Sequence, residues 1–181
     1  IKKLISHSKA LQVTVESPHL GIACNISHYV DLMMFWTNQR PVNVNTNRLE
    51  RIWINSKRPT YFEINGEIAI QFSNHASLKL ISGHKTKKDL ISGQDLETKQ
   101  KFEIDEINGV AKIFNNRLIN GSMLLQSEMT GVLLDELIST TTCKLTSLDE
   151  AIEGYGIIVE SLNDHWNECT SGPQVLNIPI T

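Results

Sequence analysis

The segment GIACNISHYVDLMMFW, residues 21–36, decides how the rest of the chain is interpreted. Its apolar residues recur at steps of three and four, which predicts a helix over residues 22–37. Cys24, Asn25, His28 and Asp31 interrupt the apolar pattern. At about 100° per residue, Cys24, His28 and Asp31 fall within about 60° of one another, and Asn25 flanks them. The polar residues therefore share one face of the helix, close to its start.

Two interpretations of this polar face remain open from spacing alone. In the first, His28 is a buried residue held by a hydrogen bond to Asp31, with Cys24 as a small core filler. In the second, His28 is a general acid–base at the mouth of a cleft, oriented by its neighbours. The start of a helix also offers unpaired backbone N–H groups to a polar ligand.

The middle of the chain changes to a period of two, which is typical of strands. Two Asn-Gly pairs, at 65–66 and 108–109, favour tight hairpin turns, and Asn120-Gly121 is a third possible turn. The polar residues 83–99 are expected to form a loop or a sheet edge with a short strand. The segments with strand patterns are 11–17, 42–46, 51–55, 61–72, 76–82 and 101–114. Together they predict an antiparallel sheet of roughly six strands within an α+β domain.

The last part of the chain is predicted to be helical. Ser127 can cap a helix that runs to about residue 139, and Ser147 with Glu150 forms a capping-box pattern. Gly154-Tyr155-Gly156 lies inside a helical pattern and is interpreted as helix packing. His165 lies near a helix end, where its charged form would interact with the helix dipole. One apolar stripe is predicted for the last helix, made of Leu148, Ala151, Ile152, Tyr155, Val159, Leu162 and Trp166.

Composition narrows the function classes. The 181 residues carry a net charge of −3 and 40% hydrophobic residues, which is ordinary for a globular protein and argues against a nucleic-acid partner. No apolar run approaches the ~20 residues of a membrane span. Cys24, Cys143 and Cys169 are far apart, so neither a disulfide framework nor a metal site is expected, and a cytoplasmic location is predicted. Because the first residue is Ile, we expect a piece of a longer protein.

Residues 28–44, HYVDLMMFWTNQRPVNV, resemble the first helix and following strand in the C-terminal domain of the glucose–fructose oxidoreductase / inositol dehydrogenase (Gfo/Idh/MocA) family. The family pattern is G…D-x-G-x-H-x-x-D, and Gly21, His28 and Asp31 match it. The resemblance continues in residues 140–151, in the HWN of the final helix and in the closing residues 178–181, and so covers nearly the whole chain. It implies an α+β fold with an open, mostly antiparallel sheet and helices packed on one face.

The resemblance also implies a function. Residues 1–181 would be a single substrate-binding and oligomerisation domain, and NAD or NADP would bind to an N-terminal domain that is absent from this chain. His28 would take the proton from a hydroxyl of a sugar-like substrate, and a free imidazole titrates at about 6.5, which suits that role. Asn25 is predicted to bind a substrate hydroxyl, and Asp31 either to orient His28 or to anchor the helix. Cys24 stands where the family pattern has a carboxylate, and it is included in the predicted substrate site.

Two functions are therefore carried forward. The first is the C-terminal half of an NAD(P)-dependent oxidoreductase acting on a sugar, a polyol or a sugar derivative, with the isolated chain inactive. The alternative is a non-catalytic ligand-binding or oligomerisation module of the same fold. A homodimer or homotetramer through the sheet is also predicted, because an exposed sheet face rich in Ile, Phe and Trp would be costly in a monomer.

Overall fold

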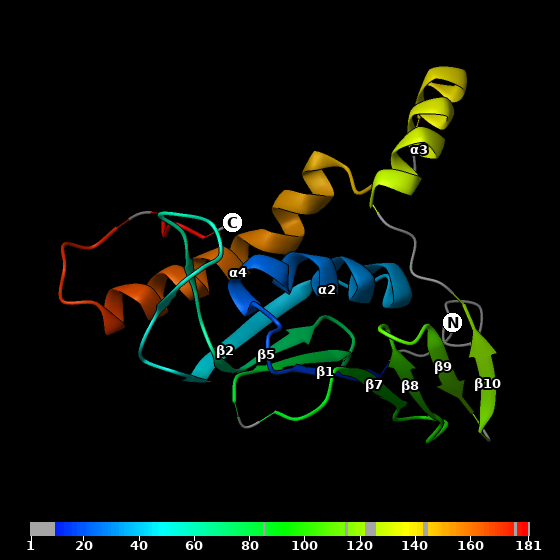
Figure 1. Cartoon of the computed structure of the whole chain (residues 1–181), viewed down its shortest axis with the longest axis horizontal. Helices are drawn as coiled ribbons and strands as arrows, with labels where there is room; N and C mark the ends of the chain where they lie inside the picture. Colours follow the sequence, from blue (N-terminus) through cyan, green and yellow to red (C-terminus); the bar gives the residue numbers. More distant parts are fainter. Residues whose placement is uncertain are drawn as a thin grey trace.

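A computed structural model describes residues 10–84, 86–114, 116–121, 126–142, 145–175 and 177–180. Figure 1 shows a twisted sheet with two helices, α2 and α4, lying across it and a third helix, α3, projecting from the body. The eight strands of the sheet lie in the order β10-β9-β8-β7-β1-β6-β5-β2. β1 pairs with β6 in parallel, and the other pairs in the sheet are antiparallel. The predicted α+β class with a mostly antiparallel sheet is confirmed.

The elements follow one another along the described chain with short connections. The helices are α2 (Ile22–Thr37), α3 (Gln126–Thr140) and α4 (Leu148–Cys169). The strands are β1 (Leu11–Ser17), β2 (Pro41–Leu49), β3 (Ile54–Asn55), β4 (Phe62–Glu63), β5 (Gly66–Phe72), β6 (Ser77–Ser82), β7 (Leu90–Asp95), β8 (Lys101–Asp105), β9 (Val110–Ile113) and β10 (Arg117–Asn120). β3 and β4 form a separate two-stranded sheet. None of the described helices is long and apolar enough to cross a membrane.

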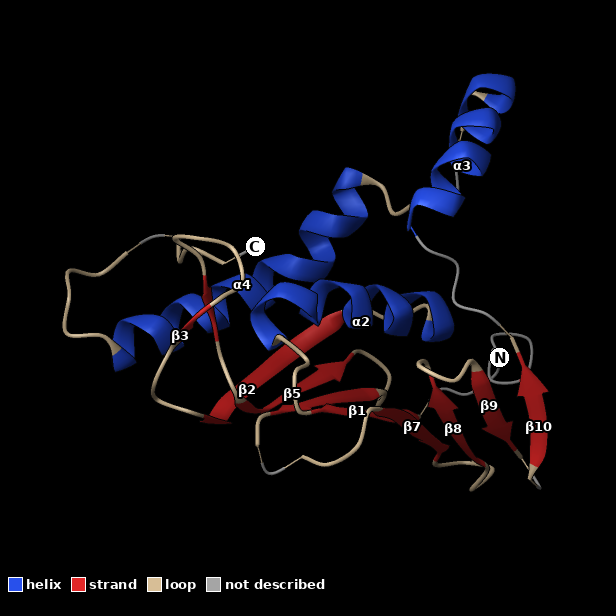
Figure 2. Ribbon diagram, viewed as in Figure 1, coloured by secondary structure: helices blue, strands red, loops and turns tan. Residues whose placement is uncertain are grey.

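The core lies between the sheet and its two covering helices, α2 and α4, as Figure 2 shows. α2 packs against β6 and α4, and α4 packs against β2. Alternate residues of the central strands are buried there, such as Val13 of β1, Ile70 of β5 and Leu80 of β6. Strand alternation places one apolar side of the sheet under the helices.

The open face of the sheet is polar. Gln12 of β1 lies opposite Ser77 of β6, and Thr14 lies opposite Lys79. Lys79 pairs in turn with the carboxylate of Glu67 at 3.2 Å. The expected apolar open face, which was the reason given for self-association through the sheet, is therefore wrong, because the aromatic side chains of the strands, Phe72 and Phe102, are buried.

The Asn65-Gly66 pair does not form the predicted hairpin turn. β4 pairs with β3, whereas Gly66 opens β5 and pairs with Leu49 of β2 and with Ser82. A Cβ atom on Gly66 would lie 2.5 Å from the carbonyl oxygen of Arg48. Glycine is required here because the backbone of β2 approaches it closely, and not because of a tight turn.

The second Asn-Gly pair does lie in a hairpin, which joins β8 to β9. Only Gly109 has a positive φ, and the turn is held by the Asp105 carboxylate, which accepts from the backbone N–H of Asn108 at 2.9 Å. Residues 83–99 contain the expected short strand, β7, but it lies inside the sheet between β8 and β1 and not at an edge. The possible turn at Asn120-Gly121 leads into residues 122–125, which lie outside the described residues.

α4 begins as predicted. Ser147 accepts from the backbone N–H of Glu150 at 3.3 Å, and the Glu150 carboxylate accepts from the N–H of Ser147 at 3.0 Å, which completes the capping box. The predicted apolar stripe is buried only in part, however. Leu148 and Ile152 are 74% and 61% exposed, and the residues buried on α4 are Gly154, Ile158, Leu162 and His165.

α3 spans nearly the predicted range, but it begins at Gln126, and the side chain of the predicted cap, Ser127, lies outside the described part of the structure. The apolar side chains of α3 remain exposed, including Val132 at 68% and Ile138 at 78%. Together with Leu148 and Ile152 of α4, they make the helices a main place where apolar surface meets solvent.

Candidate functional site

The predicted polar stripe forms the outward face of α2. His28 and Phe35 are exposed, and Cys24 and Asp31 are half-buried. The opposite side of the helix is buried against the sheet and α4. Its buried residues include Ile26, Val30 and Met33, which share one face of the helix. The grouping of Cys24, His28 and Asp31 is thus confirmed, and the interpretation of His28 as a buried core residue is wrong.

Asp31 ties α2 to α4. Its carboxylate accepts from the Thr146 hydroxyl at 3.2 Å and from the hydroxyl of Tyr155. Burial, followed by this hydrogen bond and the charge of Asp31, raises the pKa of Tyr155 well above its ordinary value. Among the described residues, no hydrogen bond joins Asp31 to His28. Of its two predicted roles, the contacts of Asp31 favour the anchoring of the helix.

Asn25 stabilises the loop that leads into α2. Its Nδ2 atom donates to the carbonyl oxygen of Leu20 at 2.6 Å. The same Nδ2 atom would lie 3.2 Å from a Cβ atom at Gly21, so this loop is tightly packed. The Oδ1 atom has no hydrogen-bond partner among the described residues, and it remains available to a ligand hydroxyl.

The start of α2 is closed by Glu63 of β4, a residue that the sequence did not point to. Its Oε1 atom accepts from the N–H of Ala23 at 2.5 Å, and its Oε2 atom accepts from the N–H of Cys24 at 3.2 Å. The N-terminal N–H groups that we expected a ligand to use are therefore bound by the protein's own carboxylate. Glu63 lies 40 residues after Ala23, and no local spacing links the two.

A small polar cavity of about 170 Å³ lies on the flank of α2, beside the stripe. Tyr29 reaches into it and donates a hydrogen bond to Glu106. Burial is the main cause that raises the pKa of Tyr29 to about 12, and the charges of Glu106 and Asp89 add to it. Desolvation also raises the pKa of the Glu106 carboxyl. Ser17 donates to Asp89 in the same cavity.

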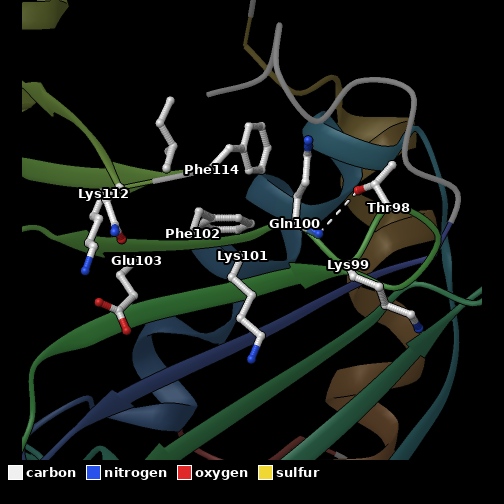
Figure 3. Close-up of a pocket in the computed structure, with 10 residues that line it drawn as sticks. Thr98, Lys99, Gln100, Lys101, Phe102, Glu103, Lys112 and Phe114 are labelled. Atoms are coloured by element: carbon white, nitrogen blue, oxygen red, sulfur yellow. Dashed lines mark hydrogen bonds between the residues drawn. The ribbon is translucent and has the colours of Figure 1, made fainter.

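Two further cavities lie elsewhere. One of about 320 Å³ lies between the end of α2 and the start of α4 and is lined by Asp31, Phe35 and Arg40 among others. The other, of about 550 Å³, lies at the β8–β9 hairpin. Figure 3 shows the side chains of Lys101 and Lys112 on one side of its strands and the ring of Phe114 on the other. None of the four predicted site residues lines the hairpin cavity, so we place the candidate site on α2.

His165 was interpreted from the sequence as a partner of the helix dipole, and this is wrong. The imidazole is buried beside Trp53, with its Nε2 atom 3.6 Å from the Cys169 sulfur. Burial is the main cause that lowers the pKa of His165, so the ring carries no charge to offer the dipole at neutral pH. No group of three His, Cys, Asp or Glu side chains that could hold a metal ion occurs among the described residues.

Neither a protein-family profile nor a curated protein matches the sequence. Solved structures share its fold. The UDP-N-acetylglucosamine 3-dehydrogenase GnnA from Acidithiobacillus ferrooxidans is 11% identical with a TM-score of 0.55, over 87% of this chain and 52% of that chain. The aldose-aldose oxidoreductase from Caulobacter crescentus, complexed with glycerol, is 11% identical with a TM-score of 0.55, over 92% and 55%. The dehydrogenase MviM from Clostridium difficile is 10% identical with a TM-score of 0.57, over 91% and 57%.

The chain therefore has the fold of the C-terminal domain in dehydrogenases of the Gfo/Idh/MocA type, and the resemblance inferred from the sequence is confirmed for the fold. The solved structures include sugar-related oxidoreductases. This chain spans little more than half the length of the structures that it matches.

Proposed function

We propose that the chain is the substrate-binding domain of an NAD(P)-dependent oxidoreductase that acts on a sugar, a polyol or a sugar derivative. The observation that carries the proposal is the position of His28. It is exposed on the outward stripe of α2, in a fold that sugar-related dehydrogenases share. An imidazole in this place can reach a ligand that binds over the helix, whereas a core histidine could not.

In the proposed reaction, the neutral imidazole of His28 accepts the proton of a substrate hydroxyl. NAD or NADP, bound by the rest of the protein, would supply the hydride-acceptor chemistry at the same carbon. Asn25 offers its Oδ1 atom to a neighbouring hydroxyl of the substrate. Cys24 lies one turn before His28 and borders the substrate, where its thiol is a weak hydrogen-bonding group.

The cofactor site is proposed to lie in a domain outside these residues. Helix starts are the usual binding place of a pyrophosphate. Within this chain the start of α2 does not fit one, because Glu63 already occupies the N–H groups of Ala23 and Cys24. The share of the solved structures that this chain leaves uncovered is the second support for a further domain.

The alternative function, a non-catalytic binding or oligomerisation module, is favoured by one observation. A catalytic histidine is commonly oriented by a hydrogen-bonded partner. Asp31 is engaged by Thr146 and Tyr155, and position 24 is a cysteine. Within the described residues, His28 thus has no carboxylate bonded to its ring.

An assay of enzymatic turnover, with the wild type and a His28 variant, distinguishes the two functions. The full natural chain is assayed with NAD⁺ and NADP⁺ on a panel of sugars and polyols. We expect His28→Ala to lower kcat by about 10²-fold or more, in the range of lost general acid–base catalysis. His75→Asn is the matched control, because His75 is an exposed histidine in a turn with φ 73° that asparagine tolerates. Equal rates for the wild type and His28→Ala would leave only the non-catalytic function.

Two further predictions accompany this proposal. The two cysteines within the described residues, Cys24 and Cys169, are free thiols, which supports the predicted cytoplasmic location, whereas Cys143 lies outside the described part. The homodimer or homotetramer also stays a prediction. Because the open face of the sheet is polar, an interface through it would be built from hydrogen bonds and ion pairs.

A further inference from the structure

α2 begins without a cap of its own. Its N-cap residue is Gly21, in the left-handed region with φ 63°, and no acidic residue occurs in the first turn. A helix start in this condition leaves several N–H groups without partners. The acceptor for N–H groups at this helix start is the carboxylate of Glu63, which lies outside the helix and outside the predicted site.

Contacts of its carboxylate and of its strand hold Glu63 in place. Its Oε1 atom accepts from the N–H of Ile64 at 3.0 Å as well as from Ala23. Its backbone lies in β4, where it pairs with Ile54 of β3. The preceding residue, Phe62, donates its N–H to the carbonyl of Pro179 at 2.8 Å. The carboxylate thus reaches α2 from a fixed strand.

The carboxylate and the loop before α2 fit together closely. A Cβ atom on Gly21 would lie 3.1 Å from Oε2 of Glu63 and 3.2 Å from Nδ2 of Asn25. The loop, the carboxylate and the Asn25 amide therefore pack as one unit around the first turn of α2. A carboxylate that accepts from backbone N–H groups at a helix start forms strong, charge-assisted hydrogen bonds.

We infer that Glu63 is a positioning residue for His28, an inference that rests on the proposed function. Helical side chains lean toward the helix N-terminus, so the His28 ring lies over the turn that contains Cys24. Glu63 fixes that turn through the N–H of Cys24. The carboxylate that the family pattern has at position 24 is thus supplied to the same turn from β4, as an anchor of its backbone. Loss of the anchor lets Asn25 and His28 move together.

Kinetics of the full natural chain provide the first test. Glu63→Ala is expected to lower kcat by about tenfold or more with KM changed less than about threefold, because misplacement acts on the reacting geometry. Glu63→Gln keeps the reach of the side chain and one accepting oxygen but turns an N–H donor toward the start of α2, so its kcat should fall between those of the wild type and the alanine variant, whereas Glu63→Asp withdraws the carboxylate by one methylene and should behave like the alanine variant. Glu160→Gln, an exposed acid on α4, is the matched control and should behave like the wild type.

Amide hydrogen exchange of the same proteins provides a readout that needs no activity. In Glu63→Asp, and in Glu63→Ala where it folds, the amides of Ala23 and Cys24 should exchange about tenfold faster or more, while those of β1 keep their protection. Unchanged exchange in both variants would overturn the inference.

The kinetic outcomes separate the two proposals. If His28→Ala is inactive and Glu63→Asp turns over like the wild type, the inference fails and the proposed function stands. If His28→Ala is fully active, the proposed function is wrong, and so is the role of Glu63 toward His28.

Discussion

Tyr29 and Glu106 form a pair whose protonation depends on folding. The pKa of Tyr29 is raised from 10.0 to about 12, first by burial and then by the charge and hydrogen bond of Glu106. Because the folded-state pKa lies above the ordinary value, the folded protein binds the phenolic proton more tightly than the unfolded chain. The stability that this group contributes is complete below pH 10.0 and is lost as the pH rises through about 12.

Glu106→Gln should lower the midpoint of Tyr29 ionisation below 12 while leaving it above 10.0, because burial is the largest cause and remains. The measurement is an absorbance titration of tyrosinate, with Tyr29→Phe used to assign the transition. Glu103→Gln, an exposed acid on β8, is the control and should leave the midpoint unchanged. A midpoint that does not move in Glu106→Gln would show that the pair does not form.

The contact between α2 and α4 depends on a glycine. A Cβ atom on Gly154 would lie 2.7 Å from the sulfur of Met34, whereas a Cβ atom on Gly156 would meet nothing within 4 Å. Gly154→Ala should therefore lower the free energy of unfolding by about 1–3 kcal/mol through overpacking. Gly156→Ala should raise it by up to about 1 kcal/mol through better helix propensity. Urea denaturation of the two variants measures both changes, and equal effects would contradict the packing of α4 on Met34.

The elements that depend on nearby residues could be predicted from the sequence. The helix at residues 22–37 follows from apolar spacing, and the capping box of Ser147 and Glu150 is a contact over three residues. The buried side of α4 could not be predicted in this way. Leu148 and Ile152 are as apolar as Ile158. The buried side of α4, however, lies about a quarter turn around the helix from them. Periodicity shows that an apolar face exists, and tertiary packing decides which face is buried.

The parts of the site that depend on distant residues could not be predicted. The common face of Cys24, His28 and Asp31 follows from helix geometry alone. The contact of Glu63 with α2 crosses 40 residues, and the partner of Tyr29 comes from the end of β8. Each is a single polar contact between segments whose proximity is set by the fold, so no local pattern records it.

The predicted self-association concerns the whole molecule and can be tested on the open face of the sheet. Thr14 lies near the centre of that face, opposite Lys79 and Ser92. Thr14→Arg places a second cation beside Lys79 and should dissociate an assembly that forms through the sheet. Light scattering at micromolar concentration gives the mass, against 20.4 kDa for a single chain of these residues. If Leu148→Ser dissociates the assembly and Thr14→Arg does not, the interface lies on the helices.

The position of β1 has a consequence for biosynthesis. It is the first described strand to leave the ribosome, yet both of its neighbours, β6 and β7, come much later, and Gln12 pairs with Ser77 and Gln94. At a synthesis rate of about 5–20 residues per second, β1 stays unpaired for on the order of several seconds before its first partner strand is made. During that time its unpaired edges are open to other nascent chains, because α2, the helix that follows β1, packs against β6, α4 and β4. A chain stalled before β6 is therefore the form of this protein most exposed to aggregation and to chaperone capture.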